Sequence, residues 1–351
     1  MADPIYDRLA DSLNALPSGF PRTQSGVEIR ILKKMFSEEQ AELAGQLRGE
    51  FEQAADIAAR IALPVKDVTG RLFEMTRKGL IWFDKVDGRP CFRLAPFVVG
   101  SYEAQIDELD HEYAHLMEAY MLEGGAAGIM QPQPALHRVV PAQSAYKSET
   151  ILPYDDVRLL FLSAKAYHVE ECICRKERAL VDHACDFPKS MCFSVSERER
   201  TPVEGDISRD DAMALLARAE EIGLVHTVSN VARGVSYVCN CCGCCCAILR
   251  GINEWGIAKS VAAANYYAVI DPEFCAGCGN CRERCQVKAI SEQDGVSVVD
   301  RGKCIGCGLC VSGCPNEVAR LVKKPEAEMV QPPADYAAWE HARLVNRGLA
   351  S

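Results

Sequence analysis

The sequence predicts a multidomain α+β protein, and three observations lead to that prediction. In the first hundred residues, apolar residues at helical spacing are followed by the pattern of a two-stranded hairpin. Eighteen of the 19 cysteines lie between residues 172 and 314. The last eight form two copies of one spacing pattern, each cysteine 29 residues before its counterpart. Because 351 residues suffice for two or three domains, we expect an N-terminal domain, a cysteine-rich middle domain and a duplicated C-terminal domain.

The N-terminal part of the chain is expected to be mainly helical. Residues 1–25 hold prolines and one short apolar pattern, which predict a short helix within a loose arm. Residues 26–123 follow as a domain. Within it, apolar side chains recur at helical spacing over 54–61 and 65–78, and Gly79 suits the position just after the second helix.

A two-stranded hairpin is predicted directly after these helices. Its strands are 80–84 and 91–94, and Asp87-Gly88 is a favoured hairpin turn. A helix, a turn, a second helix and a two-stranded wing, in this order, resemble a winged-helix domain. The resemblance implies that residues 65–78 can enter the major groove of DNA. The alternative is a winged helix that docks a protein or joins two chains as a homodimer.

The charge of this segment favours protein docking over DNA binding. Between residues 65 and 93, seven basic residues against four acidic ones leave a net charge of +3, and the whole chain carries −10. DNA-binding domains usually present a denser basic surface to the phosphates. We therefore expect a solvated face for the seven basic residues, which are Lys66, Arg71, Arg77, Lys78, Lys85, Arg89 and Arg93.

An acidic amphipathic helix is expected over 101–123, and it carries the string HEYAH. His111, Glu112 and His115 fit the zincin pattern H-E-x-x-H, in which two histidines one turn apart bind zinc. A five-letter match in a helix rich in Ala and Glu has little specificity, and no third ligand stands out. Surface histidines are therefore the favoured interpretation. Glycines and prolines then mark residues 124–150 as a linker.

Residues 151–254 are predicted to form an α/β metal domain. Helices are expected over about 153–166 and 208–221, with strands near 167–173 and 224–228. Ten cysteines fall within 75 residues, which in a reducing compartment indicates metal binding rather than disulfides. They form the pattern C-x-C-x10-C-x6-C and then the run CNCCGCCC, with members Cys172, Cys174, Cys185 and Cys192, then Cys239, Cys241, Cys242, Cys244, Cys245 and Cys246.

The identity of this metal stays open at the level of sequence. The first four cysteines are candidates for a tetrahedral zinc site, although C-x-C is not the usual spacing of a zinc knuckle. Alternatively, cysteines of both groups hold one or two further iron–sulfur clusters, and the eight cysteines downstream favour this interpretation. Buried cysteines can also act simply as small hydrophobes. Because neighbouring side chains diverge along a backbone, the six cysteines after residue 238 cannot all face one metal.

Residues 255–325 carry the duplicated segment. Its spacing is C-x2-C-x2-C-x3-C, first in Cys275, Cys278, Cys281 and Cys285 and again in Cys304, Cys307, Cys310 and Cys314. Four thiolates at this spacing are typical of [4Fe–4S] clusters, and the eight cysteines resemble those of bacterial-type two-cluster ferredoxins. That resemblance implies one cluster on Cys275, Cys278, Cys281 and Cys314, and a second on Cys304, Cys307, Cys310 and Cys285.

The two copies differ at one position. Gln286 follows Cys285, whereas Pro315 follows Cys314. The missing proline changes a local turn and its backbone donors at the second cluster.

Residues 326–351 form a tail with a short helix, expected to wrap onto the body or onto a partner.

The middle domain and the tail of the chain together resemble a wider group. The strings LPYDDV, CICRKE, GLVH and CNCCGCCC are similar to those of a recurring, poorly characterised family of iron–sulfur proteins with a ferredoxin tail behind a cysteine-rich domain. Cys241-Cys242-Gly243 is also similar to the CCG modules of heterodisulfide reductases, which hold a noncubane cluster. The paired, widely spaced cysteines of those modules are not reproduced in this sequence.

The sequence also bounds the compartment. The chain does not begin with basic residues followed by an apolar segment, so the sequence predicts no signal peptide. No apolar run approaches the 18 residues of a membrane span. The many cysteines and the expected clusters suit a reducing environment. We therefore expect a cytoplasmic protein with no membrane span.

The favoured function is that of a multi-cluster electron-transfer protein. Its ferredoxin segment would relay single electrons between a redox partner, a reductase or flavoprotein, and a third metal centre in the middle domain. One alternative is an oxidoreductase whose active site is a middle-domain cluster with an open iron position, for which His226 is the candidate acid–base residue. Another is a redox-sensing regulator whose winged helix reads DNA.

Overall fold

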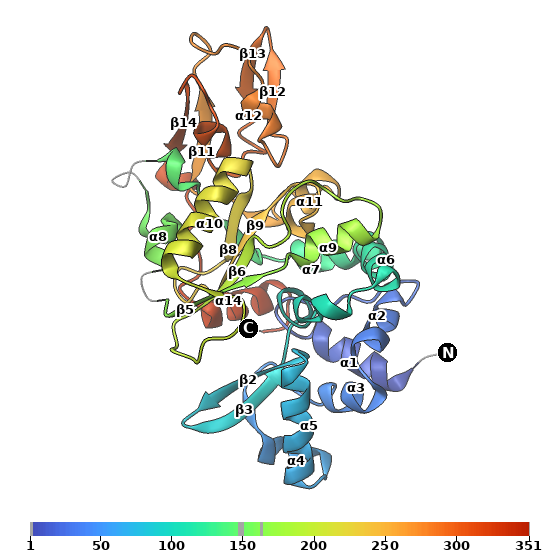
Figure 1. Cartoon of the computed structure of the whole chain (residues 1–351). Coiled ribbons are helices and arrows are strands. Elements are labelled where there is room, and N and C mark those ends of the chain that lie inside the picture. Colours follow the sequence, from blue (N-terminus) through green and yellow to red (C-terminus); the bar gives the residue numbers. More distant parts are fainter. Residues whose placement is uncertain (1–2, 147–150, 162–163, 351) are drawn as a thin grey trace. The chain divides into compact units, whose positions relative to one another are not determined.

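The computed structural model describes residues 3–146, 151–161 and 164–350. Contacts divide the chain into two compact units (Figure 1). Unit 1 comprises residues 1–132, 180–182 and 343–351, and unit 2 comprises residues 133–179 and 183–342. The middle domain and the duplicated segment therefore belong to the same unit. Over the described ranges, no helix is long and apolar enough to cross a membrane.

Unit 1 begins with short helices whose ends are set by local sequence. They are α1 (Pro4–Asn14), α2 (Val27–Met35), α3 (Glu38–Ala44), α6 (His111–Tyr120) and α7 (Ala126–Met130), with the turns η1 (Phe97–Ser101), η2 (Glu103–Glu108) and η3 (Met121–Gly125). A capping box starts α3, because the Ser37 hydroxyl accepts from the Gln40 N–H while the Gln40 side chain accepts from the Ser37 N–H. The Phe20 ring packs 4.6 Å from that of Phe97 and 5.2 Å from that of Tyr120, which joins separate helices in one core.

The helix pair and hairpin expected after residue 50 are present. They are α4 (Ala54–Ile61), α5 (Val65–Arg77), β2 (Ile81–Val86) and β3 (Arg89–Leu94), and β1 (Glu52–Gln53) completes a sheet of order β1-β3-β2. Asp87 and Gly88 have φ of 51° and 76°, as the expected turn requires. The buried Arg93 guanidinium lies 4.7 Å from the centre of the Trp82 ring. Of the seven basic residues expected on a solvated face, Arg93 is therefore buried instead.

The structure differs from two predictions for the end of unit 1 and the start of unit 2. The helix expected over 101–123 is broken, because Leu109 is extended and Asp110 caps the new helix α6 by accepting from the Tyr113 N–H at 2.7 Å. The stretch expected as a linker, 124–150, contains α7 and the strand β4 (His137–Val139). A three-residue strand is too short for periodicity to reveal. Residues 147–150 of that stretch lie outside the described part of the chain.

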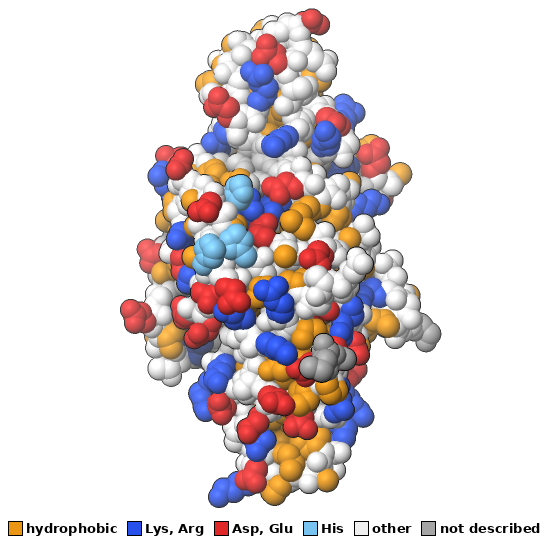
Figure 2. Space-filling view, turned by 90° about the vertical axis from the view of Figure 1, so that its right-hand side faces the viewer, with side chains coloured by type: hydrophobic (Ala, Val, Ile, Leu, Met, Phe, Trp, Pro, Cys, Tyr) orange, Lys and Arg blue, Asp and Glu red, His pale blue; other side chains and the backbone are white. Residues whose placement is uncertain are grey.

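The surface of unit 1 carries the HEYAH string. His111 and His115 are exposed, with their Nε2 atoms 3.2 Å apart, and Glu112 pairs with Lys34 at 2.6 Å. Histidines, together with interspersed acidic and basic side chains, are visible on the face shown in Figure 2. Within the described ranges, no third His, Cys, Asp or Glu lies close enough to form a metal site with these two histidines. Their geometry is that of ordinary surface histidines.

Unit 2 is built on a seven-stranded sheet of order β10-β4-β8-β9-β6-β5-β7. Besides β4, its strands are β5 (Ala166–Glu170), β6 (Cys192–Ser196), β7 (Asp206–Ile207), β8 (Val225–Ser229), β9 (Tyr237–Cys241) and β10 (Val261–Ala262). Neighbouring strands are antiparallel except β10 and β4, which are parallel. All five residues of β8 are buried, as expected for a strand covered on both faces.

Helices accompany this sheet, with α10 beside it in Figure 1. They are η4 (Gln143–Ala145), η6 (Pro153–Asp155), α8 (Val157–Leu160), α9 (Ile173–Leu180), α10 (Arg209–Ile222) and α11 (Ala247–Asn253). A Ser208–Asp211 capping box starts α10, and Gly223 with φ of 92° ends it. The helix expected over 153–166 is shorter, since α8 ends at Leu160 and β5 begins at Ala166.

The duplicated segment folds as two matching halves. It contains β11 (Tyr266–Ile270) paired with β14 (Ala319–Lys323), β12 (Ile290–Gln293) paired with β13 (Val296–Val299), and the helices α12 (Asn280–Glu283) and α13 (Leu309–Ser312). Gly277 and Gly306 occupy equivalent positions with φ of 64° and 72°. A Cβ at either glycine would lie 2.3 or 2.4 Å from a backbone carbonyl oxygen, so each copy requires glycine there.

The C-terminal tail is anchored by an arginine. Its helices are η7 (Glu326–Glu328) and α14 (Tyr336–Asn346). Within unit 1, the fully buried Arg343 donates to the carbonyl oxygens of Pro17, Ile129 and Pro132. The expectation that the tail wraps onto the body agrees with these contacts.

Candidate metal centres

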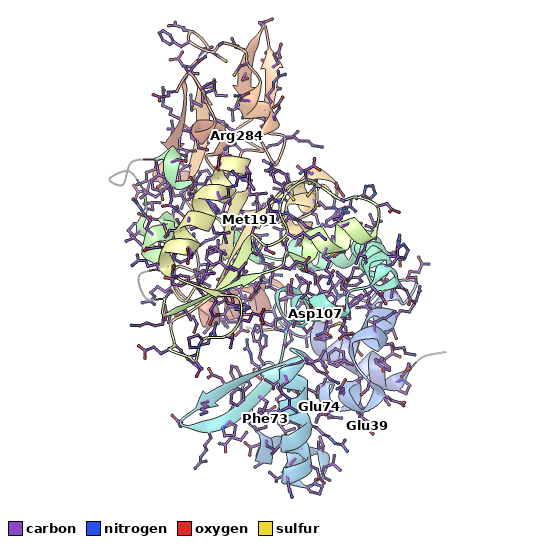
Figure 3. The ribbon with its side chains drawn as sticks, viewed as in Figure 1. Glu39, Phe73, Glu74, Asp107, Met191 and Arg284 are labelled. Atoms are coloured by element: carbon purple, nitrogen blue, oxygen red, sulfur yellow. The ribbon has the colours of Figure 1, made fainter. Side chains whose placement is uncertain are left out.

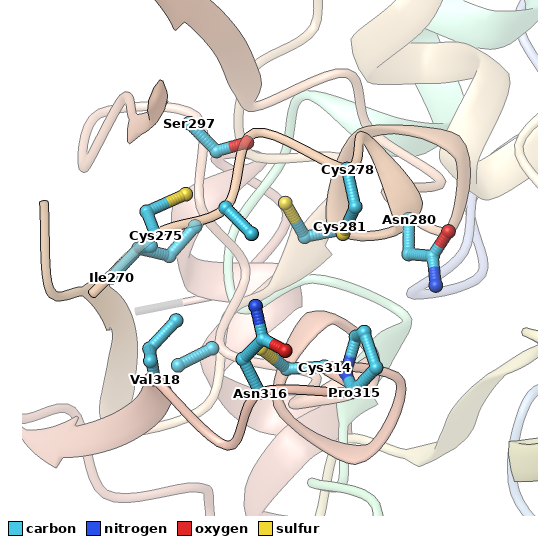
Figure 4. A pocket seen from close by; sticks show the side chains of 12 residues that line it. Ile270, Cys275, Cys278, Asn280, Cys281, Ser297, Cys314, Pro315, Asn316 and Val318 are labelled. Carbon is cyan, nitrogen blue, oxygen red and sulfur yellow. The ribbon is translucent and has the colours of Figure 1, made fainter. Parts of the chain in front are cut away.

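The four cysteines expected at the first cluster line one pocket of the duplicated segment (Figure 4). They are Cys275, Cys278, Cys281 and Cys314. Three come from the loop before α12 and its first turn, and Cys314 lies on the opposite wall, contributed by the second copy. The Ser297 N–H donates to the Cys275 sulfur and lowers the pKa of that thiol. Four convergent thiols in a partly apolar hollow fit a [4Fe–4S] cluster.

The other four cysteines of the repeat also interact with one another. They are Cys285, Cys304, Cys307 and Cys310. The Ala289 N–H donates to the Cys285 sulfur at 3.1 Å, a kind of contact that tunes cluster potentials. Burial raises the pKa of Cys307 to about 12, so a thiolate there requires the positive charge of a bound metal. Cys310 packs with Cys281 of the first set in one apolar core, so the two sites adjoin.

The ten cysteines of the middle domain divide into two groups in space. These groups differ from the two groups seen in the sequence. Cys185 joins the later run, since its sulfur and those of Cys242, Cys244 and Cys245 all lie within 4.8 Å of one another. We call these four the tetrad. The remaining six form a separate group that includes the other three members of the pattern C-x-C-x10-C-x6-C. That pattern is therefore not one four-cysteine site in space.

The tetrad has the geometry of a thiolate metal site. The Cys245 sulfur lies 3.4 Å from that of Cys185 and 3.7 Å from that of Cys244. These separations match tetrahedral zinc, whose Zn–S bonds of about 2.3 Å hold its sulfurs about 3.8 Å apart. A [4Fe–4S] cluster also takes four thiolates but holds them about 6 Å apart, so the tetrad would have to open to bind one. Cys242 and Cys245 are buried with Met191 and Leu224, whereas Cys244 is exposed. A metal at the tetrad would thus have one side toward solvent.

The four thiols of the tetrad differ in pKa. Hydrogen bonds from the thiols of Cys244 and Cys245, with the guanidinium of Arg175 nearby, hold the pKa of Cys242 well below its usual range. The hydrogen bond to Cys242 raises the pKa of Cys244 to about 12. The site therefore favours at least one thiolate before any metal arrives, and a thiolate is the form that ligates metal.

Gln286 joins the tetrad to the second cluster site. Its side-chain oxygen accepts from the Gly243 N–H at 2.7 Å, and its side-chain nitrogen donates to the Gly223 carbonyl at 2.9 Å. The Asn253 amide donates both to the Gly243 carbonyl and to the Gln286 carbonyl. Proline at position 286, as in the second copy, would offer none of these side-chain contacts. The departure from the repeat was the one sequence signal for this contact.

Arg284 adds a second connection between the middle domain and the repeat (Figure 3). Its Nη atoms donate to the carbonyls of Glu220 and Glu221 at 2.7 and 2.9 Å, at the end of α10. Its Nε donates to the Leu309 carbonyl at 2.9 Å, in the helix α13 of the other copy. Sequence reasoning missed Arg284, because a single arginine in a cysteine-rich loop has no distinctive pattern.

His226 lies within the sheet rather than at an open site. It is 1 % exposed. Its Nε2 is 3.2 Å from a Glu220 carboxylate oxygen, and its Nδ1 contacts the Asn240 side-chain oxygen. Glu220 also accepts from the N–H groups of Gln143 and Ser144. The imidazole thus links β8 to β9 and α10 by hydrogen bonds, with both ring nitrogens engaged.

Comparison with known proteins identifies only the duplicated segment. Residues 267–315 match the family model of a 4Fe-4S dicluster domain. No curated protein and no solved structure matches the chain. The C-terminal segment is therefore similar to dicluster domains that hold iron–sulfur clusters, and it lies in a chain of mixed α/β structure. The cysteines of the tetrad are compatible with a further metal or cluster.

Proposed function

We propose that the protein transfers single electrons between a redox partner, a reductase or flavoprotein, and a metal centre at the tetrad, with the dicluster domain as the relay. The contact between Gln286 and Gly243 carries this proposal. Gln286 directly follows Cys285, and Gly243 lies between Cys242 and Cys244. The path from a ligand of one centre to ligands of the next thus crosses two residues and one hydrogen bond.

The ligand set of the tetrad favours a relay over an active site. Four thiols can complete the coordination of a cubane, which leaves no iron open for substrate. The candidate acid–base residue His226 is buried between Glu220 and Asn240, so it has no free face for a substrate. An electron-transfer centre needs neither an open iron nor an acid–base group.

The cytoplasm is part of the proposal. All 19 cysteines are free, and free thiols persist in reducing compartments. Docking of a redox partner to the exposed Cys244 side of the tetrad, or to the exposed Cys278 of the first cluster site, would bring its cofactor near one end of the chain of centres.

Iron analysis and EPR spectroscopy of the anaerobically purified protein test the relay. Two [4Fe–4S] clusters supply about eight irons per chain, so a cluster at the tetrad brings the total to about twelve or more. We expect the reduced dicluster signal to be broadened by spin coupling to the tetrad centre. The double variant Cys244→Ser, Cys245→Ser should lose about four irons and that broadening.

Cys91→Ala is the matched control, because Cys91 is a buried cysteine in β3 outside every cysteine group. It should leave the iron content and the spectrum unchanged. Wild-type protein with about eight irons, zinc at the tetrad or an unbroadened dicluster signal would contradict the proposed relay.

A further inference from the structure

Six thiols of the middle domain form a closed ring separate from the tetrad. Each thiol interacts with the next, and the last with the first, in the order Cys172, Cys174, Cys246, Cys241, Cys239 and Cys192. We call this group the six-cysteine ring. Three of its members are buried and three are half-buried. In contrast to the tetrad, it has no exposed cysteine.

The local structure explains why these six thiols converge. Cys239 and Cys241 alternate along β9, so their side chains project to the same face. Cys192 begins the neighbouring strand β6, which pairs with β9. Cys242, one residue past β9, belongs to the tetrad, because successive side chains diverge. The other three members stand at the starts of α9 and α11, namely Cys172, Cys174 and Cys246.

A buried cation lies against the ring. Arg175 is 2 % exposed, and its guanidinium interacts with the charges of Cys172 and Cys192 in the ring and of Cys242 in the tetrad. It donates to the carbonyls of Pro188 and Asn240, whereas its Nε has no hydrogen-bond partner in the part of the chain that the structure describes. A guanidinium stays charged in proteins, and burial of a charge requires a countercharge. Two neutral carbonyls do not supply it, so thiolates of the ring and of Cys242 in the tetrad must.

A second buried polar atom without a partner borders the ring. His137 is 5 % exposed, and its Nε2 has no hydrogen-bond partner among the described residues. Its Nδ1 lies 3.2 Å from the Thr227 hydroxyl, which itself lies 3.4 Å from the Cys241 sulfur. Buried polar atoms are normally satisfied, and the exceptions include atoms that face the binding site of an ion or ligand. His137 and the six convergent thiols therefore point to a ligand at the ring, and Arg175 supplies a buried cation beside both the ring and the tetrad.

We propose that the six-cysteine ring binds an iron–sulfur cluster, distinct from any centre at the tetrad. Six thiols exceed the four that one tetrahedral zinc or one [4Fe–4S] cluster takes, and the dicluster domain of the same unit favours iron–sulfur over zinc. Each ligating thiol releases its proton on binding, and Arg175 partly offsets the negative charge of the thiolate-bound cluster. The proposal is independent of the proposed relay, because the ring and the tetrad share no cysteine.

Metal analysis of two double variants tests the assignment. Iron, acid-labile sulfide and zinc are measured per chain in anaerobically purified full-length protein, and iron types are separated by Mössbauer spectroscopy. Cys192→Ser, Cys241→Ser should lose about four irons and a matching amount of sulfide, while keeping the iron of the dicluster domain. Cys244→Ser, Cys245→Ser tests the tetrad separately, and Cys91→Ala is again the control.

Wild-type protein provides a readout that does not depend on the folding of a variant. With both middle-domain sites filled, its iron content should be about sixteen per chain, and Mössbauer spectra should contain irons beyond those of three cubanes. Zinc in place of iron and sulfide at the ring would overturn the proposal, as would unchanged metal content in the ring variant. Loss of iron from the ring variant alone would support the ring while contradicting the relay through the tetrad.

Discussion

Gly243 shows how one residue controls the approach of the tetrad to the second cluster site. The tetrad loop meets the repeat so closely that a Cβ at Gly243 would lie 2.0 Å from the Gln286 carbonyl oxygen and 2.8 Å from the Asn253 amide nitrogen. The same residue uses its N–H and its carbonyl for hydrogen bonds to Gln286 and Asn253. A side chain at this position must therefore separate the two elements.

Gly243→Ala should destabilise unit 2 by about 1–3 kcal/mol, because overpacking forces the backbone apart and leaves the Gly243 N–H unsatisfied. Thermal unfolding of the iron-loaded protein measures the loss. Gly70→Ala is the matched control, since a Cβ at Gly70 meets nothing within 4 Å and the position is in the exposed part of α5. That control should be neutral or slightly stabilising. Equal melting temperatures for the two variants would refute the close-packing argument.

At the scale of elements, β4 and the turn η6 are held together by a buried ion pair. Arg138 Nη1 lies 3.3 Å from an Asp155 carboxylate oxygen, and both residues are almost fully buried. Burial raises the pKa of Asp155 to about 6 despite the attraction of Arg138, and burial lowers the pKa of Arg138 to about 10. The cost of removing both charges from water thus exceeds their mutual attraction.

This pair makes stability depend on pH in a defined direction. The folded-state pKa of Asp155, about 6, lies above the unfolded value of about 3.9, so the folded state binds more protons within that window. The contribution of Asp155 is therefore present below the window and is lost as pH rises through it. Between pH 5 and 7, the stability of wild type relative to Asp155→Asn should fall by about 1 kcal/mol.

Thermal unfolding of the two proteins across this pH range measures the difference. Asp294→Asn is the control, because Asp294 is exposed in the turn before Gly295, where asparagine is equally favoured. Parallel pH profiles for wild type and Asp155→Asn would show that Asp155 does not change its protonation on unfolding.

At the scale of the whole molecule, the candidate metal ligands are concentrated in unit 2. The eighteen cysteines of the two middle-domain groups and the repeat belong to it, whereas Cys91 lies in unit 1. Unit 1 has its own core, built around Phe20, Phe97 and Tyr120 and closed by the buried Arg343. The two units therefore differ in what stabilises them, since metal binding contributes to the folding of a thiolate-rich domain.

Removal of iron should therefore affect the units unequally. After oxidative chelation of the full-length protein, hydrogen exchange should accelerate in peptides from 166–246 and 267–323 by tenfold or more, about 1.4 kcal/mol of local stability. Peptides from α1 to α3 should keep their protection. Hydrogen-exchange mass spectrometry of loaded and iron-depleted protein makes the comparison, with chelator alone as the control. Equal acceleration in both units would rule out this division.

The sequence by itself determined the features that depend on neighbouring residues. The dicluster repeat, the Asp87-Gly88 turn and the capping boxes at Ser37 and Ser208 are set by spacings of a few residues. The helix pair before the hairpin also follows from local periodicity. Such features are encoded in short segments, because their hydrogen bonds and dihedral preferences are local.

Only the tertiary structure decided how the middle-domain cysteines are shared. Cys185 meets Cys245 across 60 positions of the chain, and Gln286 meets Gly243 across 43. The strand β4, hidden in an apparent linker, exists because β8 and β10 pair with it. Contacts of this kind depend on how sheet strands and loops converge in space, and cysteines adjacent in sequence project to different sides. The sequence therefore shows how many thiols the middle domain has, and only the fold shows that they form two separate groups.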